Sequence, residues 1–413
     1  MKAGTSAACR PCQYCGGRVE LACYLASMLL LPFLLFSALA QPASLSEVER
    51  QRCPSGAIAI QQPCTLPLQV SPVAGTALLR SSESVWWLQG DRLTLIGRAS
   101  DDSYGFICCV FQFPLEPLGK SGLVGVTVRV PRLDEALIDV SLPRRSGASP
   151  PAIVRGPLAP HPAPEAKPLR GTISVVDLDS AALGERRSLF IYVPPDIAPG
   201  TRLPVIYMAD AVTHGYAPIL EAAISAGRAR PAIIVGISSA RGEGTGCVPS
   251  LTACTRRNLE YNSGANVGGS GNGSPFHRHL RFVADEVLSY VERNYPASTR
   301  REDRIAAGHS SGAVWAFSAA ARRPEVFGSV IALSAGGRES VEDAAMVDRV
   351  RIYAGAGTFE PYYLAASRAR AELARRRLGA DVRFREIVSG HSITMWSVMF
   401  AEAVEWLLSP SPT

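Results

Sequence analysis

The sequence predicts an α/β domain, with a mostly parallel sheet flanked by helices, preceded by a small all-β, sandwich-like domain. Three observations support this class. Residues 169–409 alternate short runs rich in Val, Ile and Leu with helical stretches, as the strand–helix units of a parallel sheet do. Residues 41–142 hold short strand-like runs between turn residues. Residues 143–168 contain eight prolines, which predicts an extended linker between the two domains.

Length and composition narrow the possible classes of protein. With 413 residues, the chain is long enough for two or three domains of ordinary size. Its residues are 47% hydrophobic and 19% charged, which excludes an intrinsically disordered chain. The formal net charge of +6 is spread thinly, and no Lys- or Arg-rich run has the pattern of a nucleic-acid-binding surface. We therefore expect no nucleic-acid partner.

Residues 1–40 have the layout of a secretory signal peptide. Basic residues precede an apolar run, Leu21–Phe36, and Ala38-Leu39-Ala40 forms an A-x-A cleavage site. A retained membrane anchor is the alternative, but the run is shorter than the roughly 20 residues that span a bilayer, and it contains Pro32. We therefore expect export to the periplasm or the medium, with no membrane attachment once the segment is removed.

Cysteine usage agrees with export. Four of the ten cysteines lie within residues 1–40 and would leave with the signal. An even number remains, which in an oxidising compartment favours disulfides over free thiols. The six are Cys53, Cys64, Cys108, Cys109, Cys247 and Cys254. Cys247 and Cys254 can close a small ring, whereas Cys53 and Cys64 can pair with each other or with the 108–109 pair, so the connectivity stays open.

The individual elements follow from local patterns. In the β domain, strand-like runs occur at 85–88, 93–97, 106–111 and 123–130, no stretch has a helical period, and no constellation of catalytic residue types appears. In the α/β domain, strands are expected at 188–193, 203–208, 232–237, 305–307, 330–333, 350–353 and 382–388. Helices are expected at 282–295, 313–321, 364–377 and 395–408.

A G-x-S-x-G pattern, Gly308-His309-Ser310-Ser311-Gly312, lies between the strand at 305–307 and the helix at 313–321. In that context it predicts a nucleophile elbow, a tight strand-to-helix turn that exposes the serine on a strained backbone. The two glycines are needed because side chains there would collide with the neighbouring strand and helix. Ser310 is therefore the candidate nucleophile, and the N–H of Ser311 is a candidate donor to an oxyanion hole.

A base and an acid can be chosen from chain order. Of the six histidines, His391 alone follows the last strand and fits the order serine, acid, histidine. His309 lies inside the elbow, where its side chain points away from the attack face. The loop after the strand at 350–353 holds one carboxylate, Glu360, which would orient His391 and stabilise its imidazolium. The alternative is a surface glutamate that caps the following helix.

Further candidates lie in two other loops. The second oxyanion donor is expected after the strand at 203–208, at the backbone of Ala211 or Val212. Arg257, with Glu260 and Tyr261, is a candidate to bind substrate. A structural ion pair that holds a loop is an equal alternative for this group.

Three ordered motifs resemble those of a known family. They are Gly308-His309-Ser310-Ser311-Gly312, Gly357-x-x-Glu360-Pro361 and Ser389-Gly390-His391-x-x-x-x-Trp396. Together with further matching stretches over about 185–408, they resemble the putative-esterase family of α/β hydrolases, which includes the enterochelin (siderophore) esterases. The resemblance implies an α/β-hydrolase fold and a serine esterase whose triad is Ser310, His391 and Glu360.

The sequence also departs from that family. Ala211 replaces the usual glycine after Asp210, Ser389 replaces a frequent first glycine, and Asn262–Ser274 is an unusual Gly-, Asn- and Ser-rich insertion. These departures leave the triad in place and concern the substrate pocket.

The leading hypothesis is an exported serine carboxylesterase acting on a small-molecule ester without a cofactor, with a siderophore esterase as its specific form. An acyltransferase using the same triad is one alternative. A non-catalytic surface-binding protein, in which the β domain does the work, is another. No H-E-x-x-H or H-x-E…C-x-x-C spacing occurs, so metal catalysis is not expected. The sequence indicates no oligomeric state.

Overall fold

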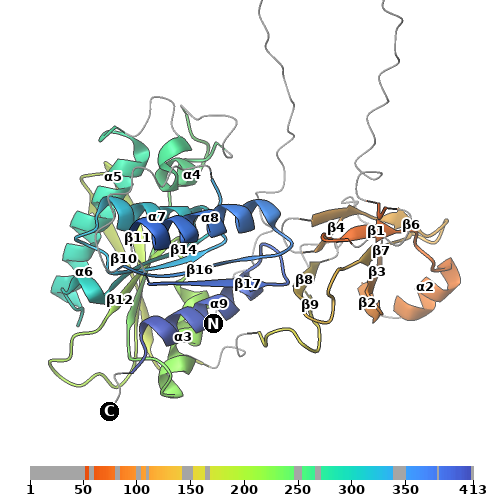
Figure 1. Ribbon diagram of the computed structural model, residues 1–413, viewed down its shortest axis with the longest axis horizontal. Helices are drawn as coiled ribbons and strands as arrows, with labels where there is room; N and C mark the ends of the chain where they lie inside the picture. The colour runs from red at the N-terminus through yellow and green to blue at the C-terminus, as the bar shows by residue number, and fades with distance from the viewer. Residues whose placement is uncertain are drawn as a thin grey trace, which may run out of the picture. The chain divides into compact units, whose positions relative to one another are not determined.

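The computed structural model describes residues 52–54, 60–79, 84–98, 104–107, 111–141, 152–162, 168–245, 254–265, 271–337, 350–378 and 381–410 (Figure 1). Contacts divide the chain into two units. The second unit comprises Ile107–Val110, Arg132–Ser141 and Pro151–Thr413, and the first unit comprises the rest. In the described part of the chain, no helix is long and apolar enough to cross a membrane.

The first unit contains an antiparallel sheet. Its strands pair in the order β1 (Cys64–Leu66), β7 (Leu123–Arg129), β3 (Arg92–Arg98) and β2 (Ser84–Gln89), and β6 (Glu116–Pro117) pairs with β7. Strands β4 (Tyr104–Ile107) and β5 (Phe111–Pro114) lie between β3 and β6 in the chain. A disulfide joins Cys53 to Cys64, one of the pairings that the sequence left open. Cys254 is also disulfide-bonded, whereas Cys247, Cys108 and Cys109 lie outside the described residues.

One helix in this unit corrects the sequence analysis. Pro72–Leu79 forms α2, although the β domain showed no helical period. Gly75 and Leu79 are buried while Val73 and Leu78 are exposed, so apolar residues surround α2 instead of forming one stripe. The pattern on which the expectation rested is therefore missing from this helix.

The second unit contains an eight-stranded mixed sheet. Its order is β10 (Thr172–Ser180), β11 (Glu185–Val193), β13 (Ile233–Ile237), β12 (Val205–Ala209), β14 (Arg304–His309), β15 (Ser329–Leu333), β16 (Arg351–Gly357) and β17 (Asp381–Ile387). The pairs that involve β10 and β11 are antiparallel, and the remaining five pairs are parallel. Strands β12, β13 and β15 are buried throughout, which explains why they read as unbroken apolar runs.

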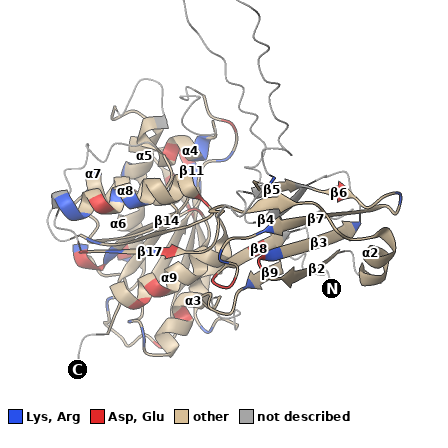
Figure 2. Cartoon of the chain, turned by 45° about the vertical axis from the view of Figure 1, so that its right-hand side comes forward, with Lys and Arg blue, Asp and Glu red and all other residues tan. Residues whose placement is uncertain are grey.

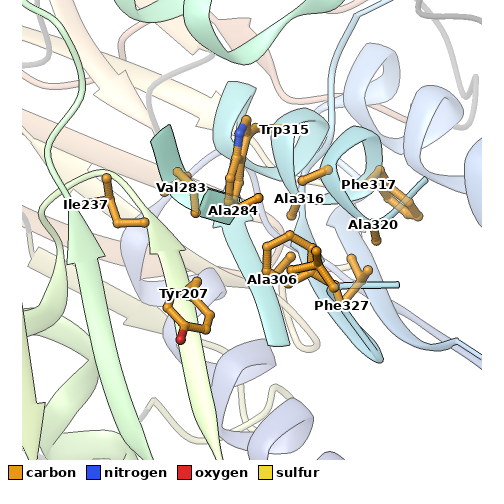
Figure 3. Close-up of a cluster of buried hydrophobic side chains, with 14 of the residues drawn as sticks. Tyr207, Ile237, Val283, Ala284, Ala306, Trp315, Ala316, Phe317, Ala320 and Phe327 are labelled. Atoms are coloured by element: carbon orange, nitrogen blue, oxygen red, sulfur yellow. The ribbon is translucent and has the colours of Figure 1, made fainter. Parts of the chain in front are cut away.

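Helices cover both faces of this sheet (Figure 1). On one face lie α3 (Thr213–Ser225) and α9 (Ile393–Leu407). On the other lie α5 (Pro275–Arg281), a π-helical turn (Phe282–Val287), α6 (Leu288–Asn294), α7 (Ser311–Arg322) and α8 (Pro361–Leu378). Figure 3 shows part of the core on this second face, where Trp315 and Phe327 lie in one cluster with Tyr207 and Val283. The short helix α4 (Arg256–Tyr261) precedes α5, and Ser263–Ala265 and Arg301–Asp303 form single 3₁₀ turns.

A hairpin-like pair also belongs to the second unit. Strands β8 (Leu137–Ser141) and β9 (Ala152–Arg155) pair antiparallel, and the N–H of Leu137 donates to the carbonyl oxygen of Val388 at 2.9 Å. Part of the segment expected as an extended linker therefore forms a strand. The reason is local, since the sequence Ala-Ile-Val-Arg of β9 carries no proline, and the prolines of this segment lie outside it.

Candidate active site

Ser310 occupies the sharp turn between β14 and α7. Its φ is +55° and its ψ is −127°, a strained conformation for a residue with a side chain. Gly308 and Gly312 make the turn possible. A Cβ on Gly308 would lie 2.4 Å from the backbone of Gly312, and a Cβ on Gly312 would lie 2.9 Å from the Cβ of Ala209. The glycine spacing expected from the sequence is thus required because neighbouring atoms leave no room for a Cβ at either position.

Glu360 and His391 come together at the ends of β16 and β17. The carboxylate Oε2 of Glu360 lies 2.5 Å from Nδ1 of His391. Glu360 is fully buried, which excludes the alternative of a surface capping residue. Its second oxygen, Oε1, accepts hydrogen bonds from the hydroxyl of Ser334 and the N–H of Gly357, both at 2.6 Å. Ser334 in turn accepts a hydrogen bond from Nε1 of Trp396 at 2.8 Å.

Aromatic side chains link this pair to Ser310. The ring of Tyr363 packs against that of His391 with centroids 4.1 Å apart, and the Tyr363 hydroxyl is hydrogen-bonded to the Ser310 side chain. Burial, followed by the nearby Glu360 charge, raises the pKa of Tyr363, so its hydroxyl stays protonated at neutral pH. The ring of Trp396 meets His391 edge-on at 4.7 Å. Serine, histidine and carboxylate therefore share one cluster at the carboxyl ends of parallel strands.

Of two other histidines, His279 is fully buried and His309 is half-buried. His309 stacks on Trp396 at 4.2 Å, and its Nδ1 lies 3.3 Å from the hydroxyl of Tyr216. Burial lowers the pKa of His309 from its ordinary 6.5 to about 4, and burial does the same to the pKa of His279. Both are therefore neutral at pH 7. His309 packs against Trp396 and Tyr216 from its place in the elbow.

The segments expected to supply oxyanion donors lie close together. Ser311 is the first residue of α7, and Val212 immediately precedes α3. Between β12 and Val212, Asp210 has a φ of +69°, in the left-handed region. A Cβ on Gly312 would lie 3.5 Å from Oδ2 of Asp210, so the turn after β12 contacts the start of α7.

Arg257 and Tyr261 face this turn. Arg257 donates two hydrogen bonds of 2.7 Å to the two carboxylate oxygens of Asp210. Tyr261 is fully buried, and its hydroxyl accepts the N–H of Asp210 at 2.9 Å. A fully buried side chain has no surface with which to touch a substrate, so Tyr261 is corrected from substrate-binding residue to loop-holding residue. The contacts of Arg257 match the structural ion pair that was its alternative.

Sequence reasoning missed Ser334 and Tyr363. Ser334 immediately follows the apolar strand β15, and Tyr363 lies in the first turn of α8. A usable signal existed, because polar residues just beyond the carboxyl ends of parallel strands gather at one edge of a sheet. The elbow motif and the order of triad residues along the chain, by contrast, do not specify residues that support the triad.

Comparisons with known proteins concern the fold and the family of the chain. The family model described as Putative esterase matches residues 180–407. The chain is 24% identical over 261 residues to the uncharacterized protein YjcH of Bacillus subtilis, covering 58% of this chain and 99% of that protein. The enterobactin esterase FES from Shigella flexneri matches with 16% identity and a TM-score of 0.60, covering 79% of this chain and 97% of that chain. The ferric enterobactin esterase from Salmonella typhimurium matches with 14% identity and a TM-score of 0.58, covering 79% and 96%. The chain therefore has the α/β-hydrolase fold and belongs to the putative-esterase family.

Proposed function

We propose that this protein is an exported serine esterase that hydrolyses carboxylic esters through Ser310, His391 and Glu360. The observation that carries the proposal is the buried carboxylate of Glu360, 2.5 Å from Nδ1 of His391, beside a serine on a strained elbow. Family membership supports ester hydrolysis as the reaction class.

The proposed reaction follows from these contacts. Since Nδ1 of His391 is bonded to the carboxylate, Nε2 is the nitrogen that takes the hydroxyl proton of Ser310 as its Oγ bonds to the ester carbonyl carbon. The carbonyl π electrons move to the oxygen, and their return breaks the bond to the alcohol, which takes the proton from His391. Water then repeats the sequence on the acyl-enzyme, which releases the acid and restores Ser310. Glu360 stabilises the imidazolium in both halves.

The negative oxygen needs preorganised donors. We assign this role to the backbone N–H groups of Ser311 and Val212, with Ala211 as the neighbouring alternative. The two segments approach each other at Gly312, which supports a common site for both donors. Loss of one such donor typically costs about 10²- to 10³-fold in kcat.

Hydrolysis of short-chain aryl esters tests the proposal. We expect Ser310→Ala and His391→Ala to lower kcat by at least about 10³-fold while Ser289→Ala stays near wild type. Ser289 is a suitable control because its hydroxyl donates a solvent-exposed hydrogen bond to the carbonyl oxygen of Asp285, four residues earlier. Equal hydrolysis by wild type and Ser310→Ala would refute the assignment, and product analysis with an added alcohol would reveal acyl transfer.

The substrate class proposed for first testing is a catecholate siderophore ester. Tyr363 packs on His391, and the adjacent Tyr362 is 51% exposed, so aromatic faces are available beside the reacting atoms. The likeness to enterobactin esterases supports the choice at the level of fold. We expect kcat/KM for a trilactone siderophore to exceed that for simple aryl esters, and equal turnover of both would argue against this specialisation.

Export is proposed from the signal-like segment, which lies outside the described residues, and is supported by the Cys53–Cys64 disulfide. Mass spectrometry of protein recovered from the periplasm or medium should show a chain that begins at Gln41. A full-length mass in the membrane fraction would favour a retained anchor instead.

A further inference from the structure

Helix α4 is anchored to the second unit by charged side chains (Figure 2 shows acidic and basic residues together at this helix). Glu260 pairs with Arg187 and accepts the N–H of Ala240 at 3.0 Å. Arg187 and Glu260 are 4% and 5% exposed, so the pair is desolvated and its geometry is closely constrained. Arg256 donates to Glu185 at 2.8 Å, but its side chain is 45% exposed. The position of α4 is therefore set by its buried contacts.

From this fixed helix, Arg257 holds the turn after β12. Its two hydrogen bonds to Asp210 are bidentate, and its guanidinium lies 4.9 Å from the ring centroid of Tyr261. Burial alone would raise the pKa of Asp210, but the charge and hydrogen bonds of Arg257 outweigh it and hold the pKa below its ordinary value. Asp210 needs such support because its φ of +69° is strained for a residue with a side chain.

The next residue on the helix, Asn258, holds the start of α7. Its Oδ1 accepts a hydrogen bond from the Ser311 hydroxyl at 2.8 Å. Asn258 is 4% exposed, and its backbone N–H donates to the capping hydroxyl of Thr255 at 3.2 Å. Adjacent residues of one short helix thus contact the two segments to which we assign the oxyanion donors.

We propose that α4 is a clamp for the oxyanion hole, in which Arg257 fixes the turn at 210–212 and Asn258 fixes Ser311. This inference rests on the proposed function. Two donors stabilise a developing oxyanion only when both point at one atom, so their separation has to be held constant through the reaction. A single helix that contacts both segments sets that separation. Arg257 and Asn258 are positioning residues, because they act through backbone groups of other residues.

Kinetics of matched variants test the clamp. We expect Arg257→Lys, which keeps the charge but loses the bidentate geometry, to lower kcat at least tenfold with KM within about threefold of wild type. The matched control is Arg256→Lys on the same helix, which should leave kcat within about twofold because its ion pair is exposed. Guanidinium ion should restore part of the activity of Arg257→Ala. A rise in KM with unchanged kcat would overturn the clamp and indicate direct substrate binding by Arg257.

The hydrogen bond between Asn258 and Ser311 is tested by a double-mutant cycle. Asn258→Ala and Ser311→Ala should each lower kcat several-fold, and the double variant should lose no more than either single variant, because both remove the same hydrogen bond. The Ser311→Ala variant retains its backbone N–H, so any loss reports positioning. If the losses in kcat of the two single variants add in the double variant, Asn258 does not position Ser311 through this hydrogen bond.

Amide hydrogen exchange gives a readout that does not depend on activity. In Arg257→Lys, the amides of 210–212 should exchange at least tenfold faster than in wild type, and in Arg256→Lys they should not. Unchanged exchange at 210–212 would overturn the clamp even in an active enzyme. Absence of Ser310-dependent ester hydrolysis in wild type would instead refute the proposed function, so the two failures are distinguishable.

Discussion

Replacing Ser334 by alanine removes a hydroxyl that joins two buried partners. Its Oγ donates to Glu360 at 2.6 Å and accepts from Trp396 at 2.8 Å, and Ser334 itself is fully buried. A hydrogen bond to a charged group contributes about 1.5–3 kcal/mol, and the orphaned Trp396 N–H costs about 1–3 kcal/mol more. We therefore expect Ser334→Ala to lower the free energy of unfolding by roughly 2.5–6 kcal/mol. If the 1.5–3 kcal/mol of the hydrogen bond to Glu360 is lost from the transition state, kcat should fall roughly 10- to 150-fold, because each 1.36 kcal/mol changes the rate about tenfold.

The assay is steady-state hydrolysis of an aryl ester, with urea unfolding of the same samples. Ser367→Ala is the matched control, because Ser367 is equally buried and its hydroxyl donates to the Ala335 carbonyl oxygen at 3.2 Å. Ser334→Gly distinguishes the effect of losing the hydroxyl from the effect of backbone strain, because Ser334 has a φ of +55°, which glycine adopts without strain. Both Ser334 variants should lose kcat alike. A Ser334→Ala enzyme with kcat within twofold of wild type would refute the reasoning.

Three further predictions concern single residues. Glu360→Gln should lower kcat by roughly 10³- to 10⁴-fold with an unchanged circular dichroism spectrum, and a loss under tenfold would contradict its role. Gly308→Ala should abolish soluble folded protein, because its Cβ would lie 2.4 Å from the Gly312 backbone, whereas Gly271→Ala, with nothing within 4 Å, should melt within about 2 °C of wild type. Burial lowers the pKa of His279 from 6.5 to about 4, so the unfolded chain binds a proton first and wild type loses stability as pH falls from 6.5 toward 4. His279→Leu should remove that loss of stability, which is about 2 kcal/mol at pH 5. If the unfolding free energies of wild type and His279→Leu depend on pH in the same way, the prediction is contradicted.

Much of the second unit could be predicted because its rules are local. Buried parallel strands read as apolar runs, and an elbow needs glycines on both sides of its serine. Chain order then singled out His391, and Glu360 was the one carboxylate in the appropriate loop. The hydrogen bond between these two residues lies where that order placed them.

The features that escaped prediction depend on contacts between distant segments. Strand β10 is an edge strand with exposed residues and therefore lacks a strong apolar pattern. The burial of Tyr261 follows from how α4 packs, which no spacing in the sequence records. Ser334 supports Glu360 across 26 positions of chain, and the hydroxyl of a serine carries no pattern of its own.

The contacts of α4 also constrain the order of events in folding. Arg257 and Asp210 are 47 positions apart in the chain, Ser311 and Asn258 are 53 apart, and Arg187 and Glu260 are 73 apart. Closing such loops costs entropy that is recovered only when the intervening strands have paired. We therefore predict that these contacts of α4 form late, after the central sheet. Activity regained on dilution from denaturant would then report the completed native unit, and earlier compact forms of the chain would be catalytically silent.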